Sequence, residues 1–216
     1  MFCCCGGAAK GLTDTGFEVT GVDITADHEY PYEFKHSNVF DLDIDWMRQF
    51  DLIWASPLCQ FYVLSNRNKQ TDHPDLIPQT RELLLKVGKP FIIENVHGAP
   101  IRNDAMLCGE MFGLKVIRHR FFEVHGFTVM QPPHEPHKLS VKDGTAIALY
   151  SGGINPGMWG NKERQVEYRK VRKQRLPPFD LKRWQQAIGI DWVSNKDHLS
   201  QAIPPKYSQY LGQYIK

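Results

Sequence analysis

The 216-residue sequence has no apolar run near the roughly 20 residues that a membrane-spanning helix needs. Its first ten residues lack the charged start and the apolar middle of a signal peptide. We also find no internal repeat and no low-complexity tract. These absences argue against membrane, secreted and repeat proteins, and we expect a soluble, cytoplasmic protein built around one domain.

Cysteine is scarce and unevenly placed. The sequence has five cysteines, an odd number, and three of them are adjacent at 3–5. This pattern does not suit a disulfide framework, so we expect a reducing compartment. Cys108 with His125, His134 and His137 lacks the paired short spacings typical of zinc sites, so the sequence predicts no metal centre.

The formal net charge is only +2, but the charge is unevenly distributed. Residues 1–60 carry ten Asp and Glu against three Lys and Arg, whereas residues 161–175 carry seven Lys and Arg against two Glu. Clustered cations displace counterions from phosphates, so the basic run favours a polyanionic partner. A solvated surface explains it equally well.

Short apolar runs alternate with helical patterns in the first half of the chain. Strands are expected over 17–23, 50–56 and 89–96, with a helix over 74–88 that ends on glycine. Strand, helix and strand at this spacing predict a doubly wound, mostly parallel α/β sheet, whose ligands bind at the carboxyl ends of the strands. Further expected elements are a strand at 121–124, loops at 131–137 and 151–157, and helices at 180–188 and 206–215.

Polar and small residues stand where two of these strands end. Gly6 and Gly7 allow a ligand to approach the backbone closely, and Asp23 at the end of the next strand is placed to accept hydrogen bonds from a ribose. Asp41, after a further extended run, is a second polar anchor, suited to an adenine amino group. A purely structural glycine turn before a helix is the alternative interpretation.

Three other features suggest reactive chemistry. Cys59 follows a strongly apolar strand and is either a nucleophile or a buried structural thiol. Glu94 lies inside an apolar strand, where burial raises the pKa of a carboxyl and makes it a proton donor near neutral pH. Alternatively Glu94 pairs with an arginine, and Arg118 and Arg120, which point to one face of a strand, supply such partners.

The order of these motifs resembles that of DNA cytosine-5 methyltransferases. The glycine turn, Pro-x-Cys-Gln at 57–60, Glu-Asn-Val at 94–96, Arg-x-Arg at 118–120 and the segment 200–207 follow the family's sequence of motifs. The resemblance runs over 2–120 and again from about 191 to the end, and the compact form most resembles the DNA methylases of bacteriophages. It implies a Rossmann-like, S-adenosylmethionine-dependent methyltransferase fold with a reduced target-recognition region.

The resemblance also implies a reaction. Cys59 would attack carbon 6 of a cytosine flipped out of double-stranded DNA, and Glu94 would engage ring nitrogen 3 and the exocyclic amine. Arg118 and Arg120 would hold the base while carbon 5 accepts a methyl group from S-adenosylmethionine. No membrane and no obligate protein partner is expected.

Residues implied to bind the cofactor come from both ends of the chain. Phe2 would lie against the adenine, Asp23 would bind the ribose hydroxyls, and Asp41 would bind the adenine amine. The implied cofactor set is Phe2, Cys5, Gly6, Gly7, Asp23, Ile24, Asp41, Leu58, Gln201, Ala202 and Ile203.

The domain organisation follows the motifs. A catalytic and cofactor-binding core spans 1–124, a reduced target-recognition region that contacts DNA spans 125–185, and 186–216 returns to the core. Trp159, Asn161 and the basic run 162–175 are the expected phosphate contacts.

The sequence departs from the family at Leu58, where a second proline is usual and would fix the backbone. Two alternatives therefore stay open. One is a related cytosine-modifying enzyme with a different donor or an acceptor such as RNA. The other is a catalytically weakened relative that only binds DNA.

Overall fold

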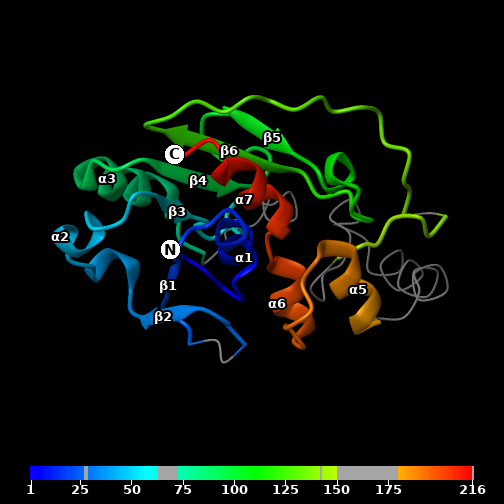
Figure 1. Ribbon diagram of the computed structural model, residues 1–216, viewed down its shortest axis with the longest axis horizontal. Coiled ribbons are helices and arrows are strands. Elements are labelled where there is room, and N and C mark those ends of the chain that lie inside the picture. Colours follow the sequence, from blue (N-terminus) through cyan, green and yellow to red (C-terminus); the bar gives the residue numbers. More distant parts are fainter. Residues whose placement is uncertain (27–28, 63–72, 142, 150–179, 216) are drawn as a thin grey trace, which may run out of the picture.

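The computed structural model describes residues 1–26, 29–62, 73–141, 143–149 and 180–215, and its elements confirm the predicted α/β class (Figure 1). The strands are β1 (Thr20–Asp23), β2 (Glu33–His36), β3 (Ile53–Ala55), β4 (Phe91–Asn95), β5 (Ala105–Leu107) and β6 (Arg120–His125). The α-helices are α1 (Gly7–Thr13), α2 (Ile44–Met47), α3 (Ile77–Val87), α5 (Leu181–Ile188), α6 (Lys196–Gln201) and α7 (Pro205–Gly212). Two 3-10 helices, η1 (Val39–Asp41) and η2 (Gly109–Phe112), complete the described elements.

The strands form a parallel two-stranded sheet and a mixed four-stranded sheet, rather than one mostly parallel sheet. β1 pairs with β2 in parallel, and the larger sheet has the order β3-β4-β6-β5. Within it β3 and β4 are parallel, as the helix α3 between them requires, but β6 runs antiparallel to both β4 and β5. The connection from β5 to β6 contains η2 and no crossover helix, so it returns the chain in the opposite direction.

The first three residues lie between the two sheets. The amide of Cys3 donates to the carbonyl oxygen of Val22 at 3.4 Å, and the amide of Ser56 donates to the carbonyl oxygen of Met1 at 3.3 Å. The extended start of the chain therefore bridges β1 and β3, and the glycine turn follows at the end of this bridge.

Alternate side chains of the larger sheet enter two separate cores. Ile53, Phe91 and Ile93 pack with residues of α2 and α3, whereas Trp54, Ile92 and Phe122 pack with residues of α1 and α7. This is the period of two expected of a strand buried on both faces. Because Glu94 is two residues after Ile92, its side chain also points to the side of α1 and α7.

Helices α1 and α7 pack against each other at glycine positions, although they are far apart in the sequence (Figure 1). A Cβ atom at Gly11 would lie 2.0 Å from the carbonyl oxygen of Pro205, and one at Gly7 would lie 2.1 Å from that of Ile203. Only glycine permits this approach, which places the segment before α7 beside the glycine turn.

A third core joins α5 and α6 to Cys5, Val116 and Ile147. The expected loop at 131–137 is present, as are the helices expected near 180–188 and 206–215. The predicted loop 151–157, Trp159, Asn161 and the basic run 162–175 lie outside the described residues, and the domain boundaries stay predictions. Among the described residues, no helix has the length and apolar character to cross a bilayer.

Candidate active site

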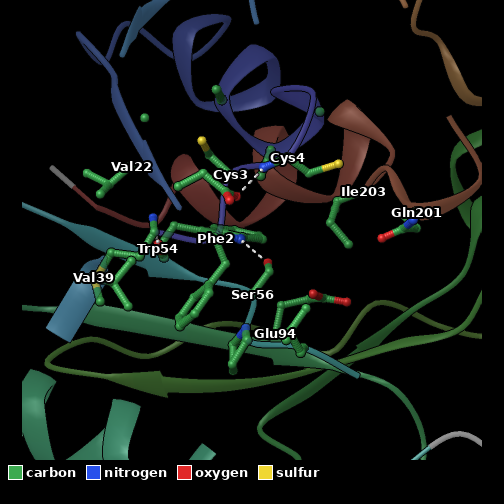
Figure 2. A pocket seen from close by; sticks show the side chains of 18 of the residues that line it. Phe2, Cys3, Cys4, Val22, Val39, Trp54, Ser56, Glu94, Gln201 and Ile203 are labelled. Carbon is green, nitrogen blue, oxygen red and sulfur yellow. Dashed lines mark hydrogen bonds between the residues drawn. The ribbon is translucent and has the colours of Figure 1, made fainter. Parts of the chain in front are cut away.

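A cleft of about 2110 Å³ lies at the carboxyl ends of the strands. Its lining joins two groups of predicted residues, which the sequence separates widely. Phe2, Val22, Val39 and Trp54 line one part, and Gln201 and Ile203 lie across from them (Figure 2). The predicted reactive residues Cys59, Glu94, Arg118 and Arg120 all line the same cleft.

Glu94 and Arg120 form a buried ion pair. Arg120 Nε lies 2.8 Å from Glu94 Oε1, and the two side chains are 14% and 5% exposed. Glu94 of β4 is directly opposite Phe122 of β6, so Arg120 occupies the diagonal position two residues away on the same face. The strand register therefore produces the ion pair. The sequence interpretation in which Glu94 pairs with an arginine is confirmed.

The surroundings of Glu94 and Arg118 shift the pKa values of both side chains. Burial raises the pKa of Glu94, although Arg120, a hydrogen bond with Ser56 and the charge of Arg118 oppose the rise. Burial and the neighbouring charge of Arg120 lower the pKa of Arg118. Arg118 lines the cleft, and its Nε is buried and has no hydrogen-bond partner among the described residues, so a buried donor lacks an acceptor.

Cys59 lies on the loop after β3. The amide nitrogen Nδ2 of buried Asn95 donates to the carbonyl oxygen of Pro57 at 2.9 Å, which fixes this loop against the end of β4. Burial raises the pKa of the Cys59 thiol; the charges of Arg120 and Arg118 lower it and that of Glu94 raises it. At neutral pH the resting side chain is therefore a thiol, partly exposed to the cleft.

The turn at the start of the chain is strained and bears polar anchors. Phe2 and Cys4 have left-handed φ angles of 56° and 45°. Residues other than glycine rarely adopt this backbone conformation, and those that do are enriched at binding sites. Asp23 Oδ2 accepts from the amide of Cys4 at 3.1 Å, and Asp23 Oδ1 accepts from that of Thr25 at 3.0 Å. The strained turn and the carboxylate thus form one unit.

Large apolar side chains border this turn. Ile24 is 69% exposed and Leu58 is 38% exposed, and both line the cleft. Phe2 packs edge to face on Phe40 with 6.2 Å between ring centroids. Exposed apolar surface beside carboxylates is suited to a ligand with a flat apolar part and hydroxyl groups.

The remaining predicted cofactor residues divide into two groups. Cys5, Asp41 and Ala202 line the cleft, but Cys5 is fully buried. Gly6 lies outside the lining. Gly7 lines the cleft and also faces the carbonyl oxygen of Ile203, so its lack of a side chain permits close packing there, while its predicted contact with a ligand stays a prediction.

Sequence reasoning missed Ser56, Asn95 and Phe40. The hydroxyl of Ser56 accepts from Trp54 Nε1 at 2.9 Å and also contacts Glu94. Ser56 directly precedes the Pro-x-Cys-Gln motif and Asn95 is the middle residue of Glu-Asn-Val, which was the available signal, but their contacts depend on the pairing of β3 with β4. Phe40 carries no such signal.

A cluster of one cysteine and three histidines has a different membership from the set that was considered in the sequence. Cys108, His134 and His137 do come together, but with His119 and not with His125. His125 is at the other end of β6 and stacks on Phe91, with 4.8 Å between ring centroids and 3° between ring planes. The spacing argument against a metal site thus considered the wrong histidine.

Comparisons with known proteins show similarity in fold. No protein family and no curated protein matches the sequence. A crystal structure of a DNMT2 mutant from Spodoptera frugiperda matches with a TM-score of 0.59 and 13% identity, over 99% of this chain and 97% of that one. The Dnmt2 methyltransferase of S. pombe matches with a TM-score of 0.56 and 16% identity, over 97% and 95%. The chain therefore has the fold of these proteins.

Proposed function

We propose that the protein is an S-adenosylmethionine-dependent DNA cytosine-5 methyltransferase of the compact type resembling those of bacteriophages. The observation that carries the proposal is that one cleft is lined by Cys59, by the Glu94–Arg120 pair and by the strained turn at Phe2 and Cys4 together with the Asp23 carboxylate that it binds. The fold shared with the Dnmt2 methyltransferase of S. pombe supports the same class.

The chemistry of cytosine explains why these residues belong together. Carbon 5 is too weak a nucleophile to accept a methyl group until a nucleophile has added at carbon 6. Cys59 Sγ would give its proton to water in the open cleft and form a bond to carbon 6, and Glu94 would give a proton to ring nitrogen 3. After methylation, carbon 5 would give its proton to water, the electrons of the bond between Sγ and carbon 6 would return to sulfur as that bond breaks, and nitrogen 3 would return its proton to Glu94, which restores the ring.

Glu94 and Arg118 suit the recognition of a cytosine. A carboxyl whose pKa is raised by burial can donate its proton to nitrogen 3 and accept from the exocyclic amine. Arg118 Nε is a buried donor without a partner, and the carbonyl oxygen of the base would supply the missing acceptor. Arg120 holds the Glu94 carboxyl in place at 2.8 Å.

The residues present fit S-adenosylmethionine. Phe2, Ile24 and Leu58 offer apolar surface for the adenine, while Asp23 and Asp41 offer carboxylates for hydroxyl and amino groups. Both Asp23 oxygens already accept one amide each, which orients them and leaves a lone pair on each. When bound, the cofactor supplies a methyl group that is electrophilic because its sulfur is a sulfonium.

Carbon 6 of a stacked cytosine is inaccessible, so the target base must leave the helix before Cys59 can reach it. Double-stranded DNA with an everted cytosine is accordingly the proposed acceptor.

The test is methyl transfer from labelled S-adenosylmethionine to DNA of mixed sequence, followed by mapping of the methylated cytosines. Cys59→Ser is expected to reduce transfer to background and to retain cofactor binding, because only the nucleophile is lost. A duplex with 5-fluorocytosine should form a covalent adduct with the wild-type protein only.

Three results would contradict the proposal. Activity retained by Cys59→Ser would refute the mechanism. Transfer to RNA but not to DNA, or transfer only from another one-carbon donor, would favour a related cytosine-modifying enzyme. DNA binding without an adduct or transfer would favour the catalytically weakened relative.

A further inference from the structure

Four metal-ligating side chains, none of which lines the cleft, converge beside the start of β6. One ligand atom each from Cys108, His119, His134 and His137 lies within 4.8 Å of all the others. His119 Nε2 is 3.3 Å from His134 Nε2 and 3.2 Å from His137 Nε2. The three imidazole rings are mutually tilted, with centroids 4.9 to 5.1 Å apart.

The strand register produces half of this cluster. β5 and β6 pair so that Ala105 is opposite Phe122 and Leu107 is opposite Arg120, where the ladder ends. Cys108 and His119 are the next residues beyond this last pair, which accounts for their proximity. Because side chains alternate along a strand, His119 points away from the face that carries Arg118 and Arg120.

The loop after β6 supplies the other half. The side-chain amide of Gln131 accepts from the amide of Met106 at 2.7 Å and donates to its carbonyl oxygen at 2.9 Å. This pair ties the loop to β5, along which it runs in yellow-green in Figure 1. His134 and His137 follow and are thereby directed toward Cys108.

A carboxylate fixes the orientation of one ring. His137 Nδ1 lies 2.7 Å from Glu110 Oε2, and Glu110 Oε1 accepts from the amides of Lys138 and Leu139 at 2.7 and 3.1 Å. With its Nδ1 proton engaged by the carboxylate, neutral His137 presents the lone pair of Nε2 to the cluster. Carboxylates orient metal-binding histidines in this way.

Distances and donor types both point to zinc. Two nitrogens bound to a tetrahedral zinc ion at about 2.0 Å are about 3.3 Å apart, which matches the two separations at His119. One sulfur and three imidazole nitrogens are borderline-soft donors that zinc prefers. Cys108 Sγ also accepts the amide of Met111, a contact that stabilises a thiolate.

We propose that Cys108, His119, His134 and His137 bind one structural Zn²⁺ ion. Four protein ligands close the coordination sphere, so the ion holds the fold rather than activating water. Binding releases the proton of the Cys108 thiol. Because His119 stands between Arg118 and Arg120, the ion also fixes the strand that presents both arginines to the cleft. The zinc site does not depend on the proposed function.

The test is the zinc content of the full chain, purified without added chelator and measured by elemental mass spectrometry. About one ion per chain is expected, and Co²⁺ in its place should give the visible bands of tetrahedral cobalt with a sulfur-to-cobalt band. Cys108→Ser should lose the sulfur band. If this variant fails to fold, His137→Ala, which alters a more exposed ligand, should show reduced affinity.

Glu110→Gln provides a sharper test, because it leaves all four ligands in place. Loss of the carboxylate that orients His137 should weaken zinc binding by about 10- to 100-fold in a competition titration with a chelator. Glu135→Gln, in the same loop between His134 and His137 but outside the cluster, is the matched control and should bind as the wild type does. Wild-type protein without zinc that also takes up neither Zn²⁺ nor Co²⁺ would overturn the proposal, as would equal affinities of the two variants.

Discussion

Arg120 Nε lies 2.8 Å from Glu94 Oε1, although the two residues are not directly opposite each other across β4 and β6. The arginine crosses two residues of the antiparallel ladder to reach the carboxyl, and both side chains are almost completely buried. A charge at such a depth is tolerated only with a partner. The pair thus has a structural role besides its proposed role in the reaction.

We first predict that Arg120→Ala will lower the free energy of unfolding by about 3 to 5 kcal/mol at neutral pH, because it leaves the Glu94 carboxyl buried without its partner. Urea unfolding followed by circular dichroism measures this. Asp45→Ala, which removes an exposed pair with Arg48, should cost at most about 1 kcal/mol. Equal losses of unfolding free energy in the two variants would show that the buried pair contributes no more to stability than an exposed pair does.

The second prediction concerns the reactivity of Cys59. Because burial raises the pKa of its thiol, the thiolate fraction should keep increasing above pH 8.5, the ordinary value being about 8.5. Alkylation by iodoacetamide, followed at the Cys59 peptide by mass spectrometry, should therefore accelerate with an apparent pKa above that value. Arg120→Gln should move the apparent pKa further upward, since the arginine charge lowers it. A midpoint near or below 8 would contradict the burial described here.

The third prediction is that Glu123, on the other face of β6, contributes stability at neutral pH that is lost in acid. Burial alone would raise the pKa of Glu123, but hydrogen bonds from Arg81 and from the amide of Arg102 outweigh it and lower the pKa. A carboxyl with a lowered folded-state pKa stabilises the fold above its unfolded pKa, about 4.3, and loses that contribution as the pH falls through the folded value.

Glu123→Gln should accordingly lower stability at pH 7 and flatten the decline between about pH 5 and pH 2. Chemical unfolding at a series of pH values measures the slope. Glu82→Gln is the control, since Glu82 pairs with Lys86 in solvent and should leave the slope nearly unchanged. Parallel curves for Glu123→Gln and the wild type would refute the assignment.

The fourth prediction is that Gly11→Ala destabilises the packing of α1 on α7. Alanine gains about 1 kcal/mol in helix propensity, but its Cβ would lie 2.0 Å from the carbonyl oxygen of Pro205 and 2.6 Å from the amide of Gln209. Backbone cannot yield as a flexible side chain does, so a net loss of about 1 to 3 kcal/mol is expected. Thermal unfolding compares it with Thr13→Ala at an exposed position of the same helix. A melting temperature equal to that of Thr13→Ala would contradict the close packing.

Much of the element pattern could be predicted because it is local. The strands near 17–23, 50–56 and 89–96 follow from apolar runs, and α3 follows from its helical spacing and closing glycine. The direction of β6 could not be predicted, since a strand of the same sequence can pair in either sense. Its direction depends on the connection from β5.

The candidate site was predictable to the extent that motif order is informative. Cys59, Glu94 and Arg120 were found from their motifs, and the structure places them in one cleft. The support that Asn95 gives to Pro57 depends on which residues of two strands become neighbours. The packing of Gly7 against the carbonyl oxygen of Ile203 could not be predicted, because a glycine has the same appearance in sequence whether it faces a ligand or another segment of the chain.

The cluster around His119 shows the same limit more sharply. Ten residues separate Cys108 from His119 along the chain, a spacing typical of no zinc motif, yet they are close because they adjoin Leu107 and Arg120, the last pair of the ladder between β5 and β6. Sequence spacing is informative only for ligands on one turn or one helix, whereas ligands on paired strands are related by register.

Consecutive residues of one strand therefore serve two different chemistries. A slip of β6 by a single position relative to its neighbours would turn the histidine toward the nucleophile and both guanidinium groups toward the cysteine of the opposite cluster, and neither assembly would survive. A slip by two positions would leave every side chain on its present face of the sheet. We expect that changes in chain length just before Arg118 are tolerated only where the preceding loop absorbs them without shifting the strand.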